Sequence, residues 1–293
     1  MNLNSIKSIL TLRYDYTQIP TLPRLKWEDL EKKEEFSLED INNQLTSHLY
    51  KQIPENYSGP ISISLSGGVD SSLALCLLKQ NFPENQIDAI SIKFSDSTDE
   101  TETASKIAKK VGVDHHIIEI DNFLEKLSDA ISITKLPFWD IHWIYVAENA
   151  KNFSNYLVSG DGGDELFGGY VFRYSKFLSK INSNSSPKDK IQAYLSCHER
   201  DHVPEQELIF DKKMQFNWKD IYDKLYPFFN NPLHPIEQVF LADYNGKLLY
   251  NFSIINNSIT KYFNLNSVTP LLSHKIIQKS MKIPTIQKYD SSL

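Results

Sequence analysis

The residues best suited to chemistry form a run of small and polar side chains at 66–72, Ser-Gly-Gly-Val-Asp-Ser-Ser. A short apolar stretch at 61–65 precedes this run, and a helical pattern follows from about Asp70. A strand that turns through glycines into a helix presents backbone N–H groups and the positive end of the helix dipole, which together bind anions. Gly67 and Gly68 let a phosphate approach where a Cβ would obstruct it. The pattern predicts a phosphate-binding loop.

The polar side chains of this run favour the same interpretation. Ser66, Ser71 and Ser72 add hydroxyl donors, and the Asp70 carboxylate suits Mg²⁺ better than a phosphate. The alternative is a plain strand–turn–helix capped by Asp and Ser, but a cap needs only one polar residue. No Gly-Lys-Ser/Thr follows and no Gly-x-Gly-x-x-Gly is present, so this is neither a Walker loop nor a dinucleotide fingerprint.

A second stretch with chemical potential lies at 159–170, Ser-Gly-Asp-Gly-Gly-Asp-Glu-Leu-Phe-Gly-Gly-Tyr. A solvated turn or a calcium loop is the alternative, but the acidic spacing does not match that of a calcium loop. Mg²⁺ usually takes one or two protein carboxylates and completes its shell with phosphate oxygens and water. We therefore expect Asp164 to face Asp70 and to share one Mg²⁺ bound to the phosphate.

The elements that must position these residues alternate between strand and helix from residue 60. Strands are expected at 61–66, 87–94, 115–120 and 156–159, and helices at 70–80, 100–111, 122–134 and 139–151. This alternation predicts an α/β fold, a parallel sheet flanked by helices. Ligands in such folds bind beyond the carboxyl ends of the strands, where the loops 66–72, 92–96 and 159–165 converge.

The pattern along the chain predicts three parts. Residues 1–36 read as an irregular lead-in or linker, and 37–170 as the α/β domain, opened by a helix with Ser37 as its cap. Residues 171–293 read as a helical part packed on the same domain.

Composition limits the partners and the compartment. A net charge of −6 over 293 residues gives no general attraction to nucleic acid or to an anionic membrane. No apolar run reaches membrane-spanning length, and the first residues do not form a signal peptide. Two cysteines, Cys76 and Cys197, form no disulfide framework and have no metal-ligand spacing, so we expect a reducing cytoplasm and Cys76 in the core.

Together, the two motifs resemble the synthetase domain of the asparagine synthetase family. The first motif alone resembles the pyrophosphate loop of the wider ATP pyrophosphatase superfamily, which NAD, GMP and argininosuccinate synthetases share. The resemblance implies an adenine nucleotide alpha-hydrolase-like fold and the use of ATP and Mg²⁺. It also implies that a carboxylate is adenylated and then attacked by ammonia or an amine, releasing AMP and pyrophosphate.

The resemblance also implies roles for individual residues. The positions that match the nucleotide loop are Leu65, Ser66, Gly67, Gly68, Asp70 and Ser71. Ile92 matches the adenine site, and Ser159 and Gly160 match positions near the ribose and the α-phosphate. Asp70 and Asp164 match the metal and pyrophosphate carboxylates, and Asp161 occupies the acidic position on the acceptor side.

The chain departs from the family at both ends. Met1 is followed by Asn2 rather than by the cysteine of a glutaminase domain, so free ammonia, a separate glutaminase subunit or another amine must serve. Asn266, Val268 and Ser273 stand where the family has Glu, Arg and Asp. Without that Arg, a fixed fork for a carboxylate is lost, and specificity for aspartate is left open.

Three further features have open interpretations. His142 and Trp143 replace small residues and either reshape the acceptor pocket or pack within a helix. The family's catalytic lysine is expected beyond 283–288, so the chain is shortened, dispenses with it, or uses Lys288. His115 and His116 follow one another in a strand and are expected to point to opposite faces as packed residues rather than metal ligands.

The sequence therefore favours an ATP-dependent amide ligase that resembles asparagine synthetase, with aspartate and ammonia as substrates. A ligase of the same family that amidates a different carboxylate is the first alternative. A non-catalytic nucleotide-binding partner protein is the second. A tRNA-modifying relative is less favoured because no basic stripe or zinc-binding cysteines accompany the loop.

Overall fold

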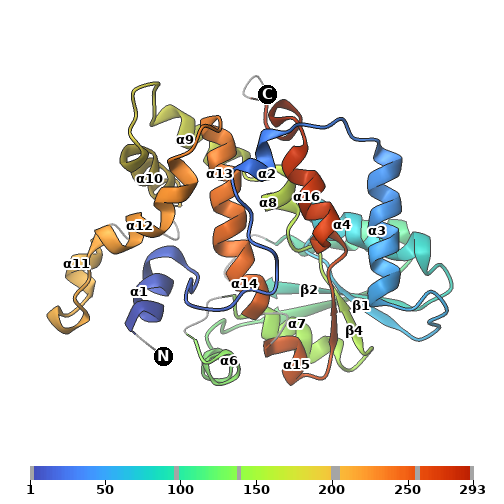
Figure 1. Ribbon diagram of the computed structural model, residues 1–293. Helices are drawn as coiled ribbons and strands as arrows, with labels where there is room; N and C mark the ends of the chain where they lie inside the picture. Colours follow the sequence, from blue (N-terminus) through green and yellow to red (C-terminus); the bar gives the residue numbers. More distant parts are fainter. Residues whose placement is uncertain (1–2, 96–98, 137–139, 199–204, 255–257, 291–293) are drawn as a thin grey trace. The chain divides into compact units, whose positions relative to one another are not determined.

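The computed structural model describes residues 3–95, 99–136, 140–198, 205–254 and 258–290 (Figure 1). The chain forms two compact units. The sheet unit consists of 37–162 and 253–276, and the helical unit consists of 1–36, 163–252 and 277–293. The segment before residue 37 belongs with the later helices, and 253–276 returns to the sheet unit.

The sheet has five parallel strands in the order β3-β2-β1-β4-β5, which confirms the predicted α/β class. The strands are β1 Ile61–Ser64, β2 Ile87–Phe94, β3 Asp114–Ile120, β4 Tyr156–Val158 and β5 Asn266–Val268. The first four fall where the sequence predicted them. The fifth was not expected, because three residues of mixed polarity give no strand pattern; it forms by pairing with β4.

Helices cover both faces of the sheet. The sheet unit contains α3 Leu38–Gln52, α4 Val69–Asn81, α5 Thr101–Val111, α6 Leu127–Thr134, α7 His142–Ala150, α15 Thr260–Tyr262 and the short 3₁₀ turn η4 Pro270–Leu272. Helix α7 packs on β1, β2 and β4, and α5 packs on β2 and β3 (Figure 1). Helix α6 begins later than predicted, and residue 139 of the predicted helix 139–151 lies outside the described residues.

Local signals set several helix ends as the sequence indicated. The Ser37 hydroxyl accepts a hydrogen bond from the Asp40 amide at 3.3 Å and begins α3. Helix α5 ends at Gly112, whose φ of +76° is a left-handed conformation that glycine adopts without strain. These ends are encoded by neighbouring residues, which is why they could be read from the sequence.

The helical unit is built from short helices. They are α1 Leu3–Leu12, α2 Glu28–Glu31, α8 Gly163–Phe167, α9 Val171–Ser179, α10 Pro187–Ser196, α11 Gln206–Ile209, η1 Lys212–Met214, α12 Trp218–Phe229, α13 Pro235–Asp243, η2 Tyr244–Leu248 and α17 Thr285–Lys288. Helices α14 (Leu249–Ile254) and α16 (His274–Lys282) cross the unit boundaries. The turn η2 is π-helical and continues α13.

Residues 3–36 contain α1 and α2 and are held by side chains of η2 and α14. The Asn245 side chain exchanges two 3.1 Å hydrogen bonds with the backbone of Leu25, and the Tyr244 hydroxyl donates to the carbonyl of Pro23 at 2.8 Å. The ring of Tyr14 stacks on that of Tyr250 at 5.5 Å. Buried side chains of η2 and α14 thus fix the lead-in to the helical unit.

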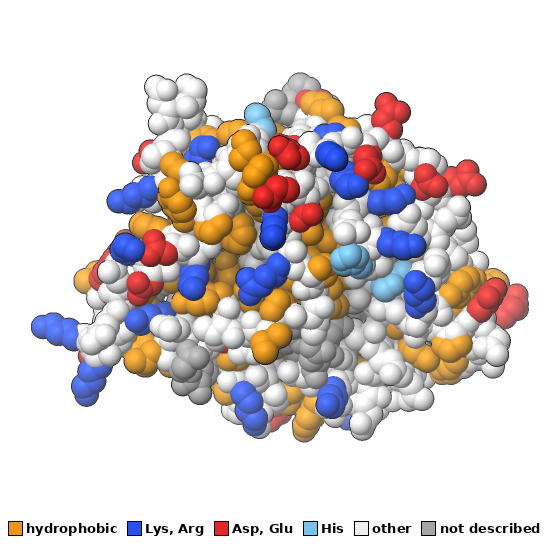
Figure 2. Space-filling model, viewed as in Figure 1, with side chains coloured by type: hydrophobic (Ala, Val, Ile, Leu, Met, Phe, Trp, Pro, Cys, Tyr) orange, Lys and Arg blue, Asp and Glu red, His pale blue; other side chains and the backbone are white. Residues whose placement is uncertain are grey.

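Within the described residues, none of the helices is both long and apolar enough to cross a membrane. On the face shown in Figure 2, basic and acidic side chains are interspersed.

Two leucines of α4 offer a test of the packing. Leu75 is 0% exposed and Leu73 is 44% exposed. We expect Leu75→Ala to lower the free energy of unfolding by about 2–5 kcal/mol because it leaves a cavity. Leu73→Ala is the control, with an expected change within about 0.5 kcal/mol. Urea unfolding followed by circular dichroism measures both, and equal effects would contradict the assigned face of α4.

Candidate functional site

The strand order reverses direction between β1 and β4, at the carboxyl ends of these strands. The chain leaves β1 toward β2 and β3, and later returns to the other side of β1 with β4. The crevice at such a reversal is where open α/β sheets bind ligands. The loops that follow these two strands contain Ser66–Ser72 and Ser159–Asp161, so the fold brings the predicted loop together with the start of the second motif.

The loop after β1 is shaped by its own serines. The Ser66 amide donates to the Ser71 hydroxyl at 3.2 Å, and the Gly68 amide donates to the Ser66 hydroxyl at 3.2 Å. The hydroxyls of Ser71 and Ser72 both donate to the carbonyl of Gly68, at 3.2 and 2.7 Å. The predicted hydroxyl donors therefore also hold the turn in shape.

The N-terminus of α4 has no side-chain cap. Its N-cap is Gly68, and no side chain bonds the first turn from that position. The alternative interpretation, in which the polar residues only cap the helix, is therefore not supported. The first amides of a helix have no intrahelical partners, so an anion can be bound there. Asp70 lies in this first turn and is half-buried.

A chain of hydrogen bonds through β2, β3 and α5 supports the loop after β1. The Ser91 hydroxyl donates to the carbonyl of Leu65 at 2.5 Å and lies 2.7 Å from Nε2 of His115. Nδ1 of His115 lies 3.1 Å from the Ser105 hydroxyl of α5. Because the Ser91 proton points to Leu65, Nε2 must donate and Nδ1 must accept, and burial lowers the pKa of His115. No sequence motif indicated this support, because its members are far apart along the chain.

Gly160 brings the two loops into backbone contact. A Cβ at this position would lie 2.5 Å from the carbonyl carbon of Asp70 and 2.6 Å from the amide nitrogen of Ser71. Only glycine allows this approach. Its neighbour Ser159 is buried, and the Ser159 amide donates to the carbonyl of Val268 in β5 at 3.0 Å. The unexpected fifth strand therefore positions the second motif.

Asp161 lies in a setting that disfavours its charged form. Its pKa is raised to about 6, mainly by burial and also by the nearby carboxylates of Asp140 and Asp70, while a 2.9 Å hydrogen bond from Ser159 opposes the shift. An acidic group with a displaced pKa at a ligand crevice is typical of a functional site. The sequence did not indicate that Asp140 would raise the pKa of Asp161.

Ile92 occupies the position predicted for the adenine. It lies near the carboxyl end of β2, is half-buried, and is in register with Ile118 of β3. Leu65 is buried, and its amide donates to the carbonyl of Ile90 at 2.9 Å. The edge of the sheet thus carries an apolar side chain beside the polar loop.

Asp164 belongs to the helical unit, in the first turn of α8. Burial raises the pKa of Asp164, and the cations of Arg173 and Lys247 oppose this shift. Its neighbour Glu165 is buried and accepts a 2.7 Å hydrogen bond from the Tyr170 hydroxyl; burial raises the pKa of Glu165 to about 7. The second motif therefore supplies residues to both units.

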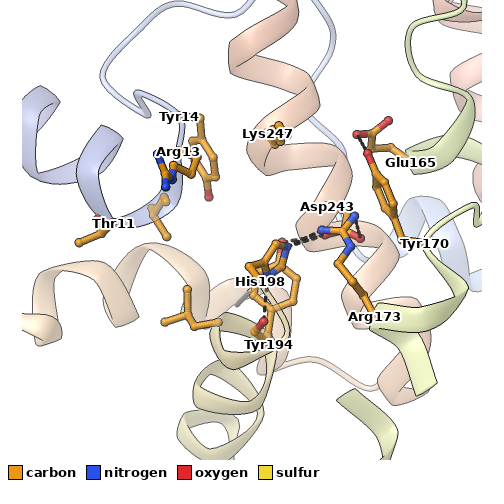
Figure 3. Close-up of a pocket in the computed structure, with 12 residues that line it drawn as sticks. Thr11, Arg13, Tyr14, Glu165, Tyr170, Arg173, Tyr194, His198, Asp243 and Lys247 are labelled. Carbon is orange, nitrogen blue, oxygen red and sulfur yellow. Dashed lines mark hydrogen bonds and ion pairs between the residues drawn. The ribbon is translucent and has the colours of Figure 1, made fainter. Parts of the chain in front are cut away.

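The helical unit also contains a pocket bordered by buried charges (Figure 3). The Arg173 guanidinium lies 3.4 Å from the centre of the Tyr170 ring and 3.7 Å from the Asp243 carboxylate. Nη1 of Arg173 lies 2.5 Å from Nε2 of His198, and the Tyr194 hydroxyl donates to Asp243 at 2.8 Å. Tyr170 ends the second motif, but Arg173, Tyr194, His198 and Asp243 belong to no motif, so the sequence did not identify them.

Lys288 is buried in the same unit. Burial and the nearby Lys33 lower its pKa to about 7, and Glu237 opposes this shift. Its ammonium lies 5.2 Å from the centre of the Phe240 ring. Gly168, whose φ is +82°, packs against the backbone of Lys288, where a Cβ would lie 2.6 Å from the carbonyl oxygen. One glycine of the second motif thus has a packing role.

Several other expectations concern single side chains. His115 contacts Ser105 of α5, whereas His116 stacks on Phe153 at 4.2 Å and bonds Asp88 at 2.8 Å, which confirms the prediction of opposite faces. Cys76 is exposed, so its expected place in the core was wrong; it lies on the outer side of α4. His142 and Trp143 are half-buried, with their rings 5.6 Å apart.

Within the part of the chain that the structure describes, no three His, Cys, Asp or Glu side chains gather closely enough to hold a metal by themselves. A nucleotide-bound Mg²⁺ does not need such a cluster, because phosphate oxygens and water supply most of its ligands.

The chain is similar in sequence to several known proteins. A family profile described as asparagine synthase matches residues 56–292. The chain belongs to this family. It is 33% identical over 117 residues to a putative glutamine-hydrolysing asparagine synthetase of Methanocaldococcus jannaschii, a match covering 38% of this chain and 23% of the relative. An NH₃-dependent NAD⁺ synthetase of Staphylothermus marinus is 26% identical over 185 residues, covering 58% of this chain and 56% of the relative.

Three asparagine synthetases similar to this chain are matched over only 18–28% of their own length. Among solved structures, an NMN synthetase from Francisella tularensis is similar with a TM-score of 0.37 and 14% identity, covering 75% of this chain and 95% of that one.

The close approach at Gly160 generates a stability prediction. We expect Gly160→Ala to lower the free energy of unfolding by about 3 kcal/mol, because the methyl group meets backbone atoms that cannot rotate away. Gly112→Asn is the control: a Cβ there has no atom within 4 Å, and Asn tolerates the left-handed conformation. Urea unfolding tests both variants. If Gly160→Ala is no less stable than Gly112→Asn, the two loops are not in contact.

The raised pKa of Asp161 generates a pH prediction. A native pKa of about 6 against 3.8 means that ionisation disfavours the folded state. Relative to Asp161→Asn, the wild type should lose stability as the pH rises from 4 to 7, with constant differences outside that window. Unfolding free energies of both proteins, measured at each pH, give the difference.

Asp99→Asn provides a control of opposite sign. Hydrogen bonds from Thr101 lower the pKa of Asp99, so the wild-type advantage over this variant should grow as the pH rises through the acidic range. The same direction of change for both variants would contradict the assignment of Asp161.

Proposed function

We propose that this member of the asparagine synthase family is an ATP-dependent amide ligase. It adenylates a carboxylate, releases pyrophosphate, and transfers the acyl group to ammonia, with aspartate as the first candidate acceptor. The observation that supports this proposal is the contact at Gly160, which brings the backbone of the second motif against the first turn of α4, the proposed phosphate site.

The loop residues have the features needed to bind the phosphates of ATP. The turn at Gly67 has a φ of +79°, and a Cβ there would lie 3.0 Å from the amide nitrogen of Ala104, so glycine is required. The N-terminus of α4 supplies amides and a positive dipole for the β and γ phosphates. Ile92 offers an apolar surface for adenine, and Ser159 and Gly160 border the ribose and the α-phosphate.

The reaction needs little covalent help from the protein. An oxygen of the substrate carboxylate attacks the α-phosphorus, the bond to the bridging oxygen breaks, and pyrophosphate leaves. Ammonia then attacks the acyl carbon, AMP leaves, and the amine loses a proton. The loop amides stabilise the charge that develops on pyrophosphate. Exclusion of water protects the acyl-adenylate from hydrolysis.

Asp70 and Asp164 are the proposed Mg²⁺ ligands, the second on the strength of its motif alone. Both are half-buried carboxylates, a donor type that Mg²⁺ prefers. When bound, Mg²⁺ would neutralise charge on the departing pyrophosphate.

The acceptor is the least constrained part of the proposal. Asp161 is proposed to act on the acceptor side, where its charge would orient an amine or an ammonium group. Where the family has Glu and Arg, this chain has Asn266 and Val268, and both belong to β5. The backbone amide of Asn266 donates to the carbonyl of Asn155 at 2.8 Å, and Val268 is buried. That observation favours the alternative of a ligase acting on a carboxylate other than aspartate.

The source of the amine is proposed to be free ammonia or ammonia from a separate glutaminase subunit. A non-catalytic, nucleotide-binding role is the remaining alternative, and it differs from both ligase proposals in predicting no turnover.

The decisive assay is pyrophosphate release from Mg·ATP with ammonium and a panel of carboxylic acids that includes aspartate. We expect acid-dependent release, and we expect Asp70→Asn to reduce it by at least about 100-fold, consistent with losing one electrostatic contact to a transition state. Asp121→Asn, a carboxylate variant in the loop after β3, is the matched control and should retain activity.

The identity of the active acid separates the candidates. Release with aspartate, and asparagine as product, supports the first proposal. Release only with another acid moves the substrate and keeps the mechanism. ATP binding without release under any condition would exclude the ligase and leave the nucleotide-binding role.

A further inference from the structure

One peptide group sets the shape of the loop between β1 and α4. It contains the carbonyl of Leu65 and the amide of Ser66, which point in opposite directions because the peptide is trans. The carbonyl accepts the 2.5 Å hydrogen bond from Ser91 of β2, and the amide donates to the Ser71 hydroxyl, in the first turn of α4, at 3.2 Å. The orientation of this peptide is therefore fixed on one side by the sheet, and on the other it is joined to the proposed phosphate site.

His115 of β3 determines where the Ser91 proton points. The hydroxyl oxygen of Ser91 and the carbonyl oxygen of Leu65 lie 2.5 Å apart, so a proton lies between them, and only the hydroxyl can supply it. Nε2 of His115 is 2.7 Å from the same hydroxyl and must therefore donate to it. Burial and the neighbouring His116 lower the pKa of His115, so its ring is neutral at neutral pH and Nδ1 carries no proton.

Ser105 of α5 selects this tautomer of His115. Its hydroxyl lies 3.1 Å from Nδ1, and it donates because an unprotonated Nδ1 can only accept. In the other tautomer, Nε2 would accept and would compete with the Leu65 carbonyl for the Ser91 proton. The hydrogen bonds therefore run in one direction, from α5 through β3 and β2 to the residue that follows β1.

Helix α5 also limits the loop directly. A Cβ at Gly67 would lie 3.0 Å from the amide nitrogen of Ala104 and 3.3 Å from the carbonyl oxygen of Glu100, at the start of α5. Ser105, the residue after Ala104, is the one bonded to His115. The helix that packs against the loop is thus joined, through one imidazole, to the peptide that begins the loop.

We propose that His115 is a positioning residue for the nucleotide loop. By holding the Ser91 hydroxyl on the Leu65 carbonyl, its imidazole keeps the loop in the shape in which the first amides of α4 can bind phosphate. It acts through Ser91 and lies on a strand that β2 separates from β1. This inference rests on the proposed phosphate site and adds a residue that controls the shape of that site.

Hydrogen–deuterium exchange of the nucleotide-free chain tests the positioning without ATP. His115→Leu removes the donor to the Ser91 hydroxyl, so we expect the amides of 66–72 to exchange about 5-fold faster, as for the loss of one hydrogen bond. His115→Gln ends in an amide that can supply an N–H, and it should restore most of the protection.

His116→Leu is the matched control, because His116 is the next residue of β3 and faces the other side of the sheet. It loses a 2.8 Å hydrogen bond to the buried Asp88, so it removes an interaction of similar size. We expect it to leave the exchange of 66–72 unchanged. Urea unfolding of both leucine variants shows whether their stabilities are comparable.

Ser105→Ala tests the selection of the tautomer and leaves the imidazole in place. We expect the same amides to exchange about 2-fold faster, because part of the population then has the Ser91 proton on Nε2 of His115 instead of on the Leu65 carbonyl. This variant also decides the question if His115→Leu does not fold.

Titration with Mg·ATP measures the consequence for binding. His115→Leu should raise the dissociation constant about 5-fold, whereas His115→Gln and His116→Leu should stay close to the wild type.

Three results would overturn the inference. They are loop exchange that His115→Leu and Ser105→Ala leave unchanged, loop exchange that His116→Leu accelerates as much as His115→Leu, and faster loop exchange in His115→Leu with unchanged ATP affinity. A wild-type chain that binds no ATP would contradict the proposed function, and loop exchange would still decide the role of His115. The two proposals can therefore fail separately.

Discussion

The backbone contact between Gly160 and the first turn of α4 is the constraint on which the candidate site depends. It exists because β1 and β4 are neighbours in the sheet, so that the loops after them leave the same edge side by side. The serines that shape the first loop and the strand β5 that holds Ser159 act on the two partners of this contact. A change at Gly160 therefore affects the site more directly than the loss of any one hydrogen bond around it.

The sequence predicted those parts of the structure that neighbouring residues encode. The apolar run, the glycines and the following helix identified β1, the loop and α4, and Ser37 and Gly112 marked helix ends. The strand order, the role of β5 and the Ser91–His115 support join residues far apart in the chain, and no local pattern contains them. The lead-in was expected to be irregular for the same reason, because its order comes from Tyr244 and Asn245 more than 200 residues later.

The sheet unit and the helical unit use charge differently. In the sheet unit, Asp161 is placed near other carboxylates, which disfavours its ionised form. In the helical unit, Arg173 and Asp243 form an ion pair at 3.7 Å, although Nε of Arg173 and Oδ2 of Asp243 have no hydrogen bond within the described residues.

The return of residues 253–276 to the sheet unit has a consequence for how the protein is made. Strand β5 pairs with β4, but it is synthesised more than a hundred residues later, after most of the helical unit. On a ribosome that adds about 5–20 residues per second, the edge of β4 waits for several seconds without its partner. During that interval, the nascent chain exposes a strand edge open to wrong pairing, a period in which a chaperone would be of use.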